Sequence, residues 1–156
     1  MNLHTADKNT GASNTMSHTL SPCKLSFNPL LLVNTDMNTR LFTNGDYEML
    51  SSWWAGNEMP VVHLSQLQTT GVIGYAKGEP ACCMFAYKCE DVAIAFLDHF
   101  IVNPFIDSLF SKLGACHSMM DEMLSILKDE GYQLIRAVTW SNTFGKACKK
   151  RWGFEL

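Results

Sequence analysis

A strand–helix–strand pattern in the second half of the chain restricts the possible folds more than any other feature. Val92 to Val102 contains only two polar residues, which is typical of a strand buried on both faces. Pro104 follows and ends the strand. A helical pattern then covers Leu109 to Glu130, and Gln133 to Trp140 returns as a strand. Two strands joined in this way run parallel, with a right-handed crossover.

The predicted long helix has one apolar face, formed at spacings of three, four and seven residues. Its members are Leu109, Leu113, Cys116, Met120, Met123, Leu124 and Leu127. Gly131 follows as a C-cap, and Lys128 lies in the last turn, where a positive charge is favourable. We therefore expect this whole face to pack against the sheet.

Earlier elements precede the crossover. Gly71 to Ala76 and Ala81 to Tyr87 form a predicted hairpin around a turn that contains Gly and Pro. Before it, Thr39 to Thr43 is a predicted strand, and Tyr47 to Ala55 a short helix with Asp46 as its N-cap.

After the crossover, a last helix is predicted from Ser141 or Asn142 to about Trp152. Phe154 to Leu156 begins one more strand. The order is therefore β, α, β, β, β, α, β, α, with a stub of strand. It predicts an α/β (α+β) fold, in which a mixed sheet carries helices on both faces.

Composition limits the size and class of the protein. The chain has 156 residues, which suits one domain, residues 23–156. Residues 1–22 are rich in Asn, Thr and Ser and hold few apolar side chains to bury, so we expect a flexible tail. The net charge of -3 disfavours nucleic acid as the main partner.

No apolar run approaches the roughly 20 residues that span a bilayer, and no secretory leader is recognisable. The six cysteines lack C-x-x-C pairs and zinc-ligand spacing, so no metal site is expected. We expect a cytoplasmic protein with reduced thiols and no membrane contact.

Two motifs resemble the GCN5-related N-acetyltransferase (GNAT) superfamily. The predicted long strand resembles the A-x-L-E-x-x-x-x-x-P strand of bacterial and phage members, here with Ala95, Leu97, Asp98 and Pro104. The chain end, NTFGKACKKRWGF, resembles the closing motif of the superfamily in the spacing of an Asn, a Gly and a final Gly-Phe. The resemblance covers about residues 39–156.

This resemblance implies an acetyl-CoA-dependent N-acetyltransferase that acts on a primary amine of a protein or a small molecule. Pantetheine would pair with the backbone of the long strand, at Phe100, Ile101 and Val102. A helix N-terminus would hold the pyrophosphate through its N–H groups. The residues implied there are Ser111, Lys112, Leu113, Gly114 and Ala115.

Asp98 stands where the subgroup has Glu, and the resemblance implies a general base whose pKa is raised by burial. The alternative is a carboxylate that bonds to neighbouring backbone or to His99. Because side chains alternate along a strand, we expect His99 on the opposite face, so that the two form no dyad. Asn142 either bonds to the pantetheine amide or only caps the last helix.

Several departures from the family pattern leave a second function open. Ser111 stands where Arg or Gln is usual, and a helix that began at Asp107 or Ser108 would use up the Gly114 amide. Lys149 replaces a Tyr that faces the leaving sulfur, and it either contacts a CoA phosphate or belongs to a solvated basic face.

The family usually continues for one or two strands beyond the Gly-Phe. The last strand pair is therefore expected to be missing, very short, or supplied by Cys23 to Val33 or by a second subunit, as in a homodimer. The alternative function is a weak or inactive GNAT-fold protein, phage-encoded, that binds a host protein.

Two further expectations concern a pair of tryptophans and one histidine. Trp53 and Trp54 either line a substrate pocket or form one core ring and one partly exposed ring. His117 is expected on the surface.

Overall fold

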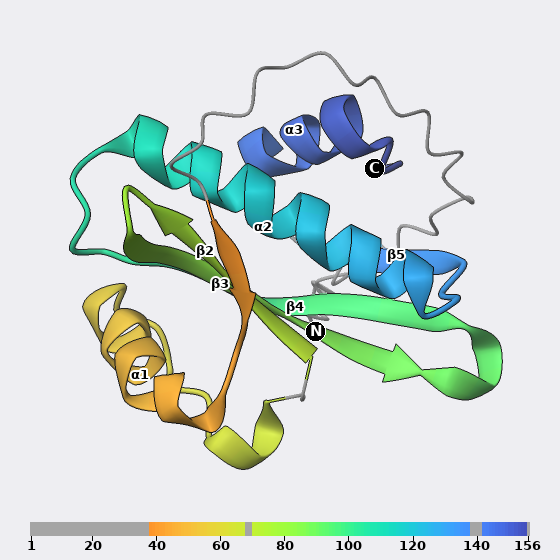
Figure 1. Cartoon of the computed structure of the whole chain (residues 1–156), viewed down its shortest axis with the longest axis horizontal. Coiled ribbons are helices and arrows are strands. Elements are labelled where there is room, and N and C mark those ends of the chain that lie inside the picture. Colours follow the sequence, from red (N-terminus) through yellow and green to blue (C-terminus); the bar gives the residue numbers. More distant parts are fainter. Residues whose placement is uncertain (1–37, 68–69, 138–141, 156) are drawn as a thin grey trace, which may run out of the picture.

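The computed structural model describes residues 38–67, 70–137 and 142–155. The predicted tail and the segment Cys23 to Val33 lie outside these residues. A five-stranded sheet in the order β1-β2-β3-β4-β5 has α1 on one face and α2 and α3 on the other (Figure 1). Within the described ranges, no helix combines the length and the apolar character needed to cross a membrane.

The strands are β1 (Thr39–Leu41), β2 (Thr70–Ala76), β3 (Glu79–Cys89), β4 (Ile94–Val102) and β5 (Leu134–Ala137). The first four pair antiparallel, and β5 runs parallel to β4. The helices are α1 (Tyr47–Gly56), α2 (Leu109–Asp129) and α3 (Asn142–Trp152). The predicted order and the mixed sheet are confirmed. Phe154 and Glu155 are not in a strand, and the rest of that predicted strand lies outside the described residues.

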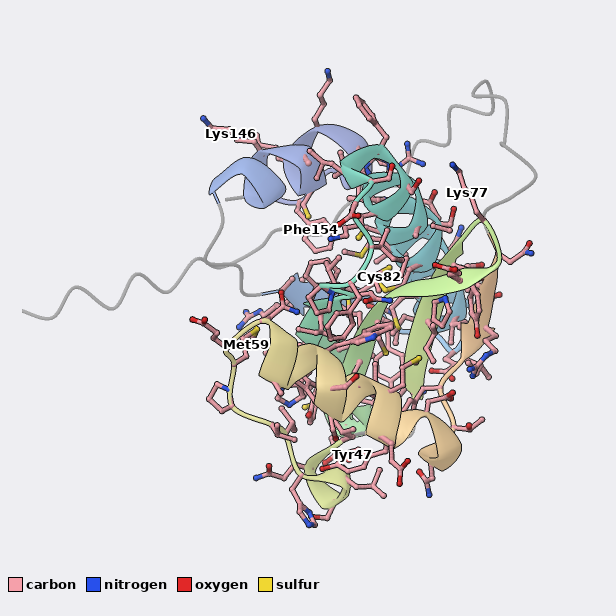
Figure 2. The ribbon with its side chains drawn as sticks, turned by 90° about the vertical axis from the view of Figure 1, so that its left-hand side faces the viewer. Tyr47, Met59, Lys77, Cys82, Lys146 and Phe154 are labelled. Carbon is pink, nitrogen blue, oxygen red and sulfur yellow. The ribbon has the colours of Figure 1, made fainter. Side chains whose placement is uncertain are left out.

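The core on the α2 side of the sheet consists mainly of small and sulfur-containing side chains. Cys82, Met119 and Met123 are among its fully buried members, and Figure 2 shows Cys82 within the packed layers. Gly74 allows the close contact between β2 and α2. A Cβ atom there would lie 2.6 Å from the Ala115 carbonyl oxygen.

The helix face predicted for α2 is wrong at its beginning. Leu109 and Leu113 are 65% and 46% exposed, whereas Ala115 and Met119 are buried. Helical periodicity identifies residues that share a face, but it does not say where along the helix the sheet begins. Here α2 contributes buried residues to the core only from Ala115 onward.

The core on the α1 side is aromatic. Trp53 and Trp54 are both buried there, together with Phe42, Phe85 and Ile101. The expectation that this pair lines a pocket, or leaves one ring partly exposed, is therefore wrong.

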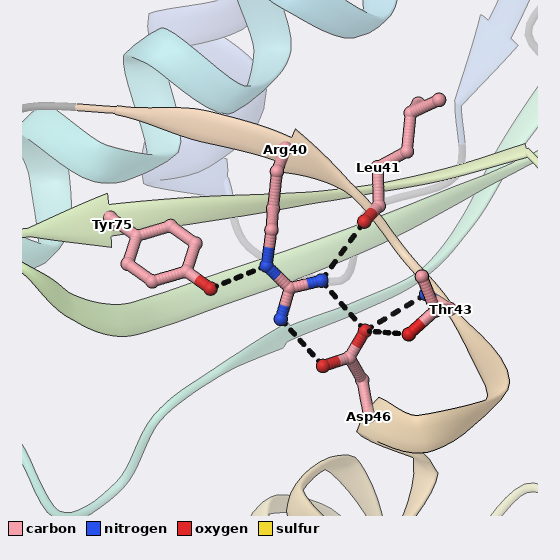
Figure 3. Close-up of polar contacts among 5 residues, drawn as sticks. All are labelled: Arg40, Leu41, Thr43, Asp46 and Tyr75. Atoms are coloured by element: carbon pink, nitrogen blue, oxygen red, sulfur yellow. Dashed lines mark hydrogen bonds and ion pairs between the residues drawn. The ribbon is translucent and has the colours of Figure 1, made fainter.

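Asp46 precedes α1, but its side chain makes no capping hydrogen bond to that helix. It instead accepts hydrogen bonds from the Thr43 amide at 2.8 Å and the Thr43 hydroxyl at 2.9 Å, and it pairs with Arg40 (Figure 3). These contacts tie β1 to the turn that begins α1.

Aromatic and ionic contacts join α3 to α2. Trp152 Nε1 donates to Asp121 Oδ1 at 2.6 Å, and Arg151 pairs with the other oxygen at 2.8 Å. The His117 ring meets the Trp152 ring edge to face, with 5.6 Å between centroids. Burial lowers the pKa of His117. His117 is thus a packing residue of this helix pair rather than a free surface histidine.

Candidate functional site

The candidate site lies at the last described pairing of β4 with β5. Their parallel register runs from Ile94 and Leu134 to Leu97 and Ala137, and the residues that follow Ala137 lie outside the described part of the chain. β4 continues to Val102, paired with β3 on its other side. A strand with an open edge is where an extended ligand can pair.

A β-bulge redirects β4 just after its last described pairing with β5. His99 has a φ of 51°, and the register with β3 shifts at the same point. Leu97 faces the α2 side before the bulge, and Phe100 faces that side after it. The extra residue therefore leaves Asp98 and His99 together toward the α1 side. The expectation that they lie on opposite faces is wrong, because it assumed unbroken alternation.

The Asp98 carboxylate is bound to the backbone of its neighbour. The His99 amide donates to Asp98 Oδ1 at 2.7 Å, and His99 Nδ1 lies 4.0 Å from the same oxygen. This geometry agrees with the alternative of a carboxylate held by adjacent backbone. The Asp98 side chain is 67% exposed, so the expected burial is wrong, and the carboxylate is open to a substrate.

Tyr87, on β3, is the third side chain of this site, beside Asp98 and His99. Its ring meets the His99 ring edge to face, with 5.5 Å between centroids, and its hydroxyl donates to the Gln66 carbonyl at 2.7 Å. Burial, and next the charge of Asp98, raise the pKa of Tyr87. The sequence motifs did not identify Tyr87 as a site residue, although strand alternation with Phe85 places it on the α1 side.

The beginning of α2 is regular helix rather than a loop. Ser108 is its N-cap, with its hydroxyl oxygen accepting from the Ser111 amide at 3.3 Å, and the Lys112 amide bonds to the Ser108 carbonyl at 3.1 Å. The alternative of an early helix start is thereby confirmed. In a helix that begins at Leu109, the amides from Leu113 onward are used by carbonyls four residues earlier.

The predicted phosphate-binding residues therefore differ in their access to a ligand. Ala115 is fully buried, Gly114 is partly buried in the second turn, and Ser111 and Lys112 lie in the first turn. The amides of Leu109 and Phe110 have no carbonyl one turn earlier within the helix. The most accessible donors thus lie slightly before the predicted set.

The predicted pantetheine segment runs along the end of β4. Ile101 is buried on the α1 side, and Phe100 and Val102 pack toward α2. The Val102 carbonyl accepts a hydrogen bond from Asn57 Nδ2 at 2.9 Å, and the same nitrogen donates to the Trp53 carbonyl at 2.8 Å. Asn57, which joins the end of α1 to β4, was not predicted from the sequence. Its position just after a helix was the available signal.

The remaining predicted contacts belong to α3. Asn142 is its first residue, and Lys149 is exposed near its end. Lys146 points away from the molecule (Figure 2), and Cys148 is buried. A role for Asn142 or Lys149 in binding a cofactor stays a prediction.

Comparisons with known proteins identify the fold. No protein-family model matches the sequence, and no curated protein matches it. Among solved structures, the ribosomal-protein-S18-alanine N-acetyltransferase from Escherichia coli is similar at 16% identity, with a TM-score of 0.62, over 76% of this chain and 77% of that one. An acetyltransferase of the GNAT family from Staphylococcus aureus Mu50 is similar at 12% identity, with a TM-score of 0.56, over 76% and 84%.

N-acetylglutamate synthase from Neisseria gonorrhoeae, complexed with coenzyme A and N-acetyl-glutamate, is similar at 12% identity with a TM-score of 0.55. The match covers 73% of this chain but spans only 27% of the synthase. At these identities the likeness concerns the fold. The chain has a GNAT-like α+β fold, as the sequence motifs predicted.

Proposed function

We propose that this protein is an acetyl-CoA-dependent N-acetyltransferase that acts on a primary amine. One observation supports the proposal: β4 continues past its last described pairing with β5 beside the exposed carboxylate of Asp98, in a chain whose fold is similar to that of acetyltransferases. One structural neighbour was crystallised with coenzyme A and an N-acetylated amino acid. The edge and the carboxylate supply a surface for an extended ligand and a proton acceptor at the same point.

The residues of the chain would have the following roles in binding and catalysis. Acetyl-CoA supplies an acyl group activated as a thioester. The backbone of Phe100, Ile101 and Val102 would align its pantetheine arm, and Asn57 would have to share or release the Val102 carbonyl. Asp98 would accept the proton that an ammonium group must lose before attack, directly or through a water. The His99 amide fixes one oxygen of that carboxylate.

The pyrophosphate would lie at the beginning of α2. The amides of Leu109 and Phe110 and the ammonium group of Lys112 would hold it, because this is the end at which N–H groups and the helix dipole favour an anion. Ser111 and Gly114 remain in the proposed site because they belong to the first two turns of α2, next to these donors. Asn142 and Lys149 are proposed to contact the cofactor from α3.

Acetyl-CoA binding and turnover test this proposal together. Calorimetry should detect binding, and hydrogen exchange should slow at the end of β4 and at the beginning of α2. Asp98→Asn should lower kcat by about 100-fold or more with little change in the Kd for acetyl-CoA, as expected for a lost general base. Asp129→Asn, an exposed carboxylate at the far end of α2, is the matched control. Absence of both acetyl-CoA binding and thiol release with primary amines would refute the proposal.

A second candidate is a weak or inactive relative that binds another protein. The observation that favours it is a group of exposed apolar side chains at the beginning of α2, the α2 patch. Its members are Phe105 at 69%, Leu109 at 65%, Phe110 at 86% and Leu113 at 46% exposure. Exposed apolar groups of this kind mark protein contacts.

The partner in this second candidate is either a second copy of the chain or, for a phage-encoded protein, a host protein. Phe105→Ser should abolish such binding and leave acetyl-CoA turnover unchanged. Light scattering at increasing concentration detects the homodimer directly. A protein that turns over amines, stays monomeric at all concentrations and is unaffected in its cellular role by Phe105→Ser would exclude this candidate.

A further inference from the structure

Arg136 is the one residue of β5 that carries a charge, and no partner for it is found in the part of the chain that the structure describes. Its Nε atom is buried without a hydrogen-bond partner, and the ion pairs formed among the described residues do not include it. Buried donors are almost always satisfied, and a charged one is costly to leave alone. A partly buried guanidinium of this kind is suited to an anion.

The sheet determines which way Arg136 faces. Its neighbours Ile135 and Ala137 pack into the core on the α2 side. Alternation therefore directs the Arg136 side chain to the α1 face of the sheet. The parallel register pairs it with Phe96 of β4, whose ring is exposed on that face.

Arg136 and Asp98 thus share one face of the sheet. Asp98 follows Phe96 by two residues, so its side chain returns to the same side. From the ordinary strand spacing and rise, the Cα atoms of Arg136 and Asp98 are about 8 Å apart. The Arg136 guanidinium, the exposed Phe96 ring and the exposed Asp98 carboxylate therefore lie one after another on this face of the sheet. We call this surface the acceptor face, and Tyr87 lies at its border.

The pyrophosphate of a cofactor does not account for Arg136. The beginning of α2, where phosphates are proposed to bind, belongs to a helix on the opposite face of the sheet (Figure 1). An anion bound by the Arg136 guanidinium would therefore belong to the molecule that approaches Asp98 from the α1 side. In an acetyltransferase that molecule is the amine.

We propose that Arg136 binds a carboxylate of the acceptor, and that this protein acetylates amines which carry an acidic group. The planar guanidinium matches a carboxylate through two parallel N–H donors. The ammonium group of the same molecule lies at Asp98, and its carbon chain lies over Phe96. This inference rests on the proposed acetyltransferase function and names its substrate class.

Matched pairs of acceptors test the substrate class. The probes are β-alanine, γ-aminobutyrate and ε-aminocaproate, each compared with its own primary amide, which keeps the amine and the chain but removes the negative charge. Thiol release from acetyl-CoA gives kcat/KM for each. For at least one chain length the acid should exceed its amide by about tenfold or more, the ratio expected for one charge-assisted contact.

Variants assign that preference to Arg136. Arg136→Gln should make the acid and the amide equal while leaving the amide rate near that of the wild type, and Arg136→Lys should restore part of the preference. Arg151→Gln, which removes an arginine that pairs with Asp121 on α2, is the control and should keep the full preference. Amides that are as good as acids in the wild type, or a preference that survives in Arg136→Gln, would overturn the inference.

A binding measurement separates this inference from the proposed function. The Nε–Hε signal of Arg136 in ¹⁵N-arginine-labelled protein should move on titration with N-acetyl-γ-aminobutyrate but not with its amide. This readout needs neither turnover nor a folded variant. A signal that moves in a protein without thiol release would refute the acetyltransferase and support the anion site, and a signal that ignores the acid would overturn the anion site.

Discussion

The contact that fixes β1 to the beginning of α1 gives the sharpest prediction of stability. Arg40 donates to both oxygens of Asp46, at 2.8 and 2.5 Å, and its Nε donates to the Tyr75 hydroxyl at 2.6 Å (Figure 3). The Thr43 amide and hydroxyl also donate to Asp46. Asp46→Asn keeps the shape of the side chain but removes its charge and one of its two acceptor oxygens.

The size of the effect follows from the pKa of Asp46. The hydrogen bond from Arg40, and then those from Thr43, outweigh burial and lower this pKa from 3.8 to about 2. At about 1.4 kcal/mol per pKa unit, this corresponds to an upper limit of roughly 2 kcal/mol. The Arg40 side chain is 42% exposed, so solvent screens the pair, and we expect a loss of about 1 kcal/mol in the free energy of unfolding.

The sign of the pH dependence is also determined. Because the folded pKa is the lower one, the carboxylate stabilises the fold fully above its unfolded pKa of about 3.9. This contribution is lost as the pH falls toward the folded pKa of about 2. The gap between the wild type and Asp46→Asn should therefore be widest from pH 5 to pH 7 and should narrow below pH 4.

Urea unfolding across this pH range measures the gap, since urea does not screen charges as guanidinium salts do. Asp91→Asn, at an exposed carboxylate in the turn before β4, is the control and should stay within about 0.5 kcal/mol of the wild type. A gap that is the same at pH 2.5 and pH 6, or no gap at pH 6, would refute the assignment of this contact.

Two further changes concern the packing of the helices and are measured by the same unfolding assay. Gly74→Ala should cost about 1–3 kcal/mol, because the new Cβ would lie 2.6 Å from the Ala115 carbonyl oxygen and would push α2 from the sheet. Gly45→Ala is its control, since the nearest atom to a Cβ there is at 3.7 Å; equal costs would contradict the reasoning. Trp152→Phe should cost about 1–2 kcal/mol through the loss of the 2.6 Å hydrogen bond to Asp121, and an unchanged stability would show that α3 is held by other contacts.

The order of the elements could be predicted because hydrophobic periodicity is a direct record of burial. The apolar run of β4 reflects its place inside the sheet, where β3 and β5 flank it and helices cover much of both faces. The crossover through α2 then follows from the rule of handedness. The last helix, α3, was predicted differently, from Ser141 or Asn142 as a candidate cap and Gly153 as a candidate end, because these residue types suit those positions.

The details of the site could not be predicted from local pattern. The φ of 51° at His99 could not be predicted from the sequence, because residues other than glycine adopt positive φ uncommonly and no local pattern marks this position. The bulge reverses the direction of every later side chain in β4, so Asp98 and His99 meet where alternation would separate them. The exposure of Leu109 depends likewise on how far α2 overlaps the sheet, a property of the tertiary arrangement.

The acceptor face exists because α1 covers only part of its side of the sheet. The described residues of the core beneath α1 include Ile73, Phe85 and Ile101, and among them there is no residue of β5 and none of β4 before the bulge. Phe96, which is 38% exposed, and Arg136, which is partly buried, therefore lie on the α1 side outside this core. A short first helix thus leaves room for an acceptor beside the last described pairing of β4 and β5, and the charges that flank this opening are of opposite sign, as an amino acid requires.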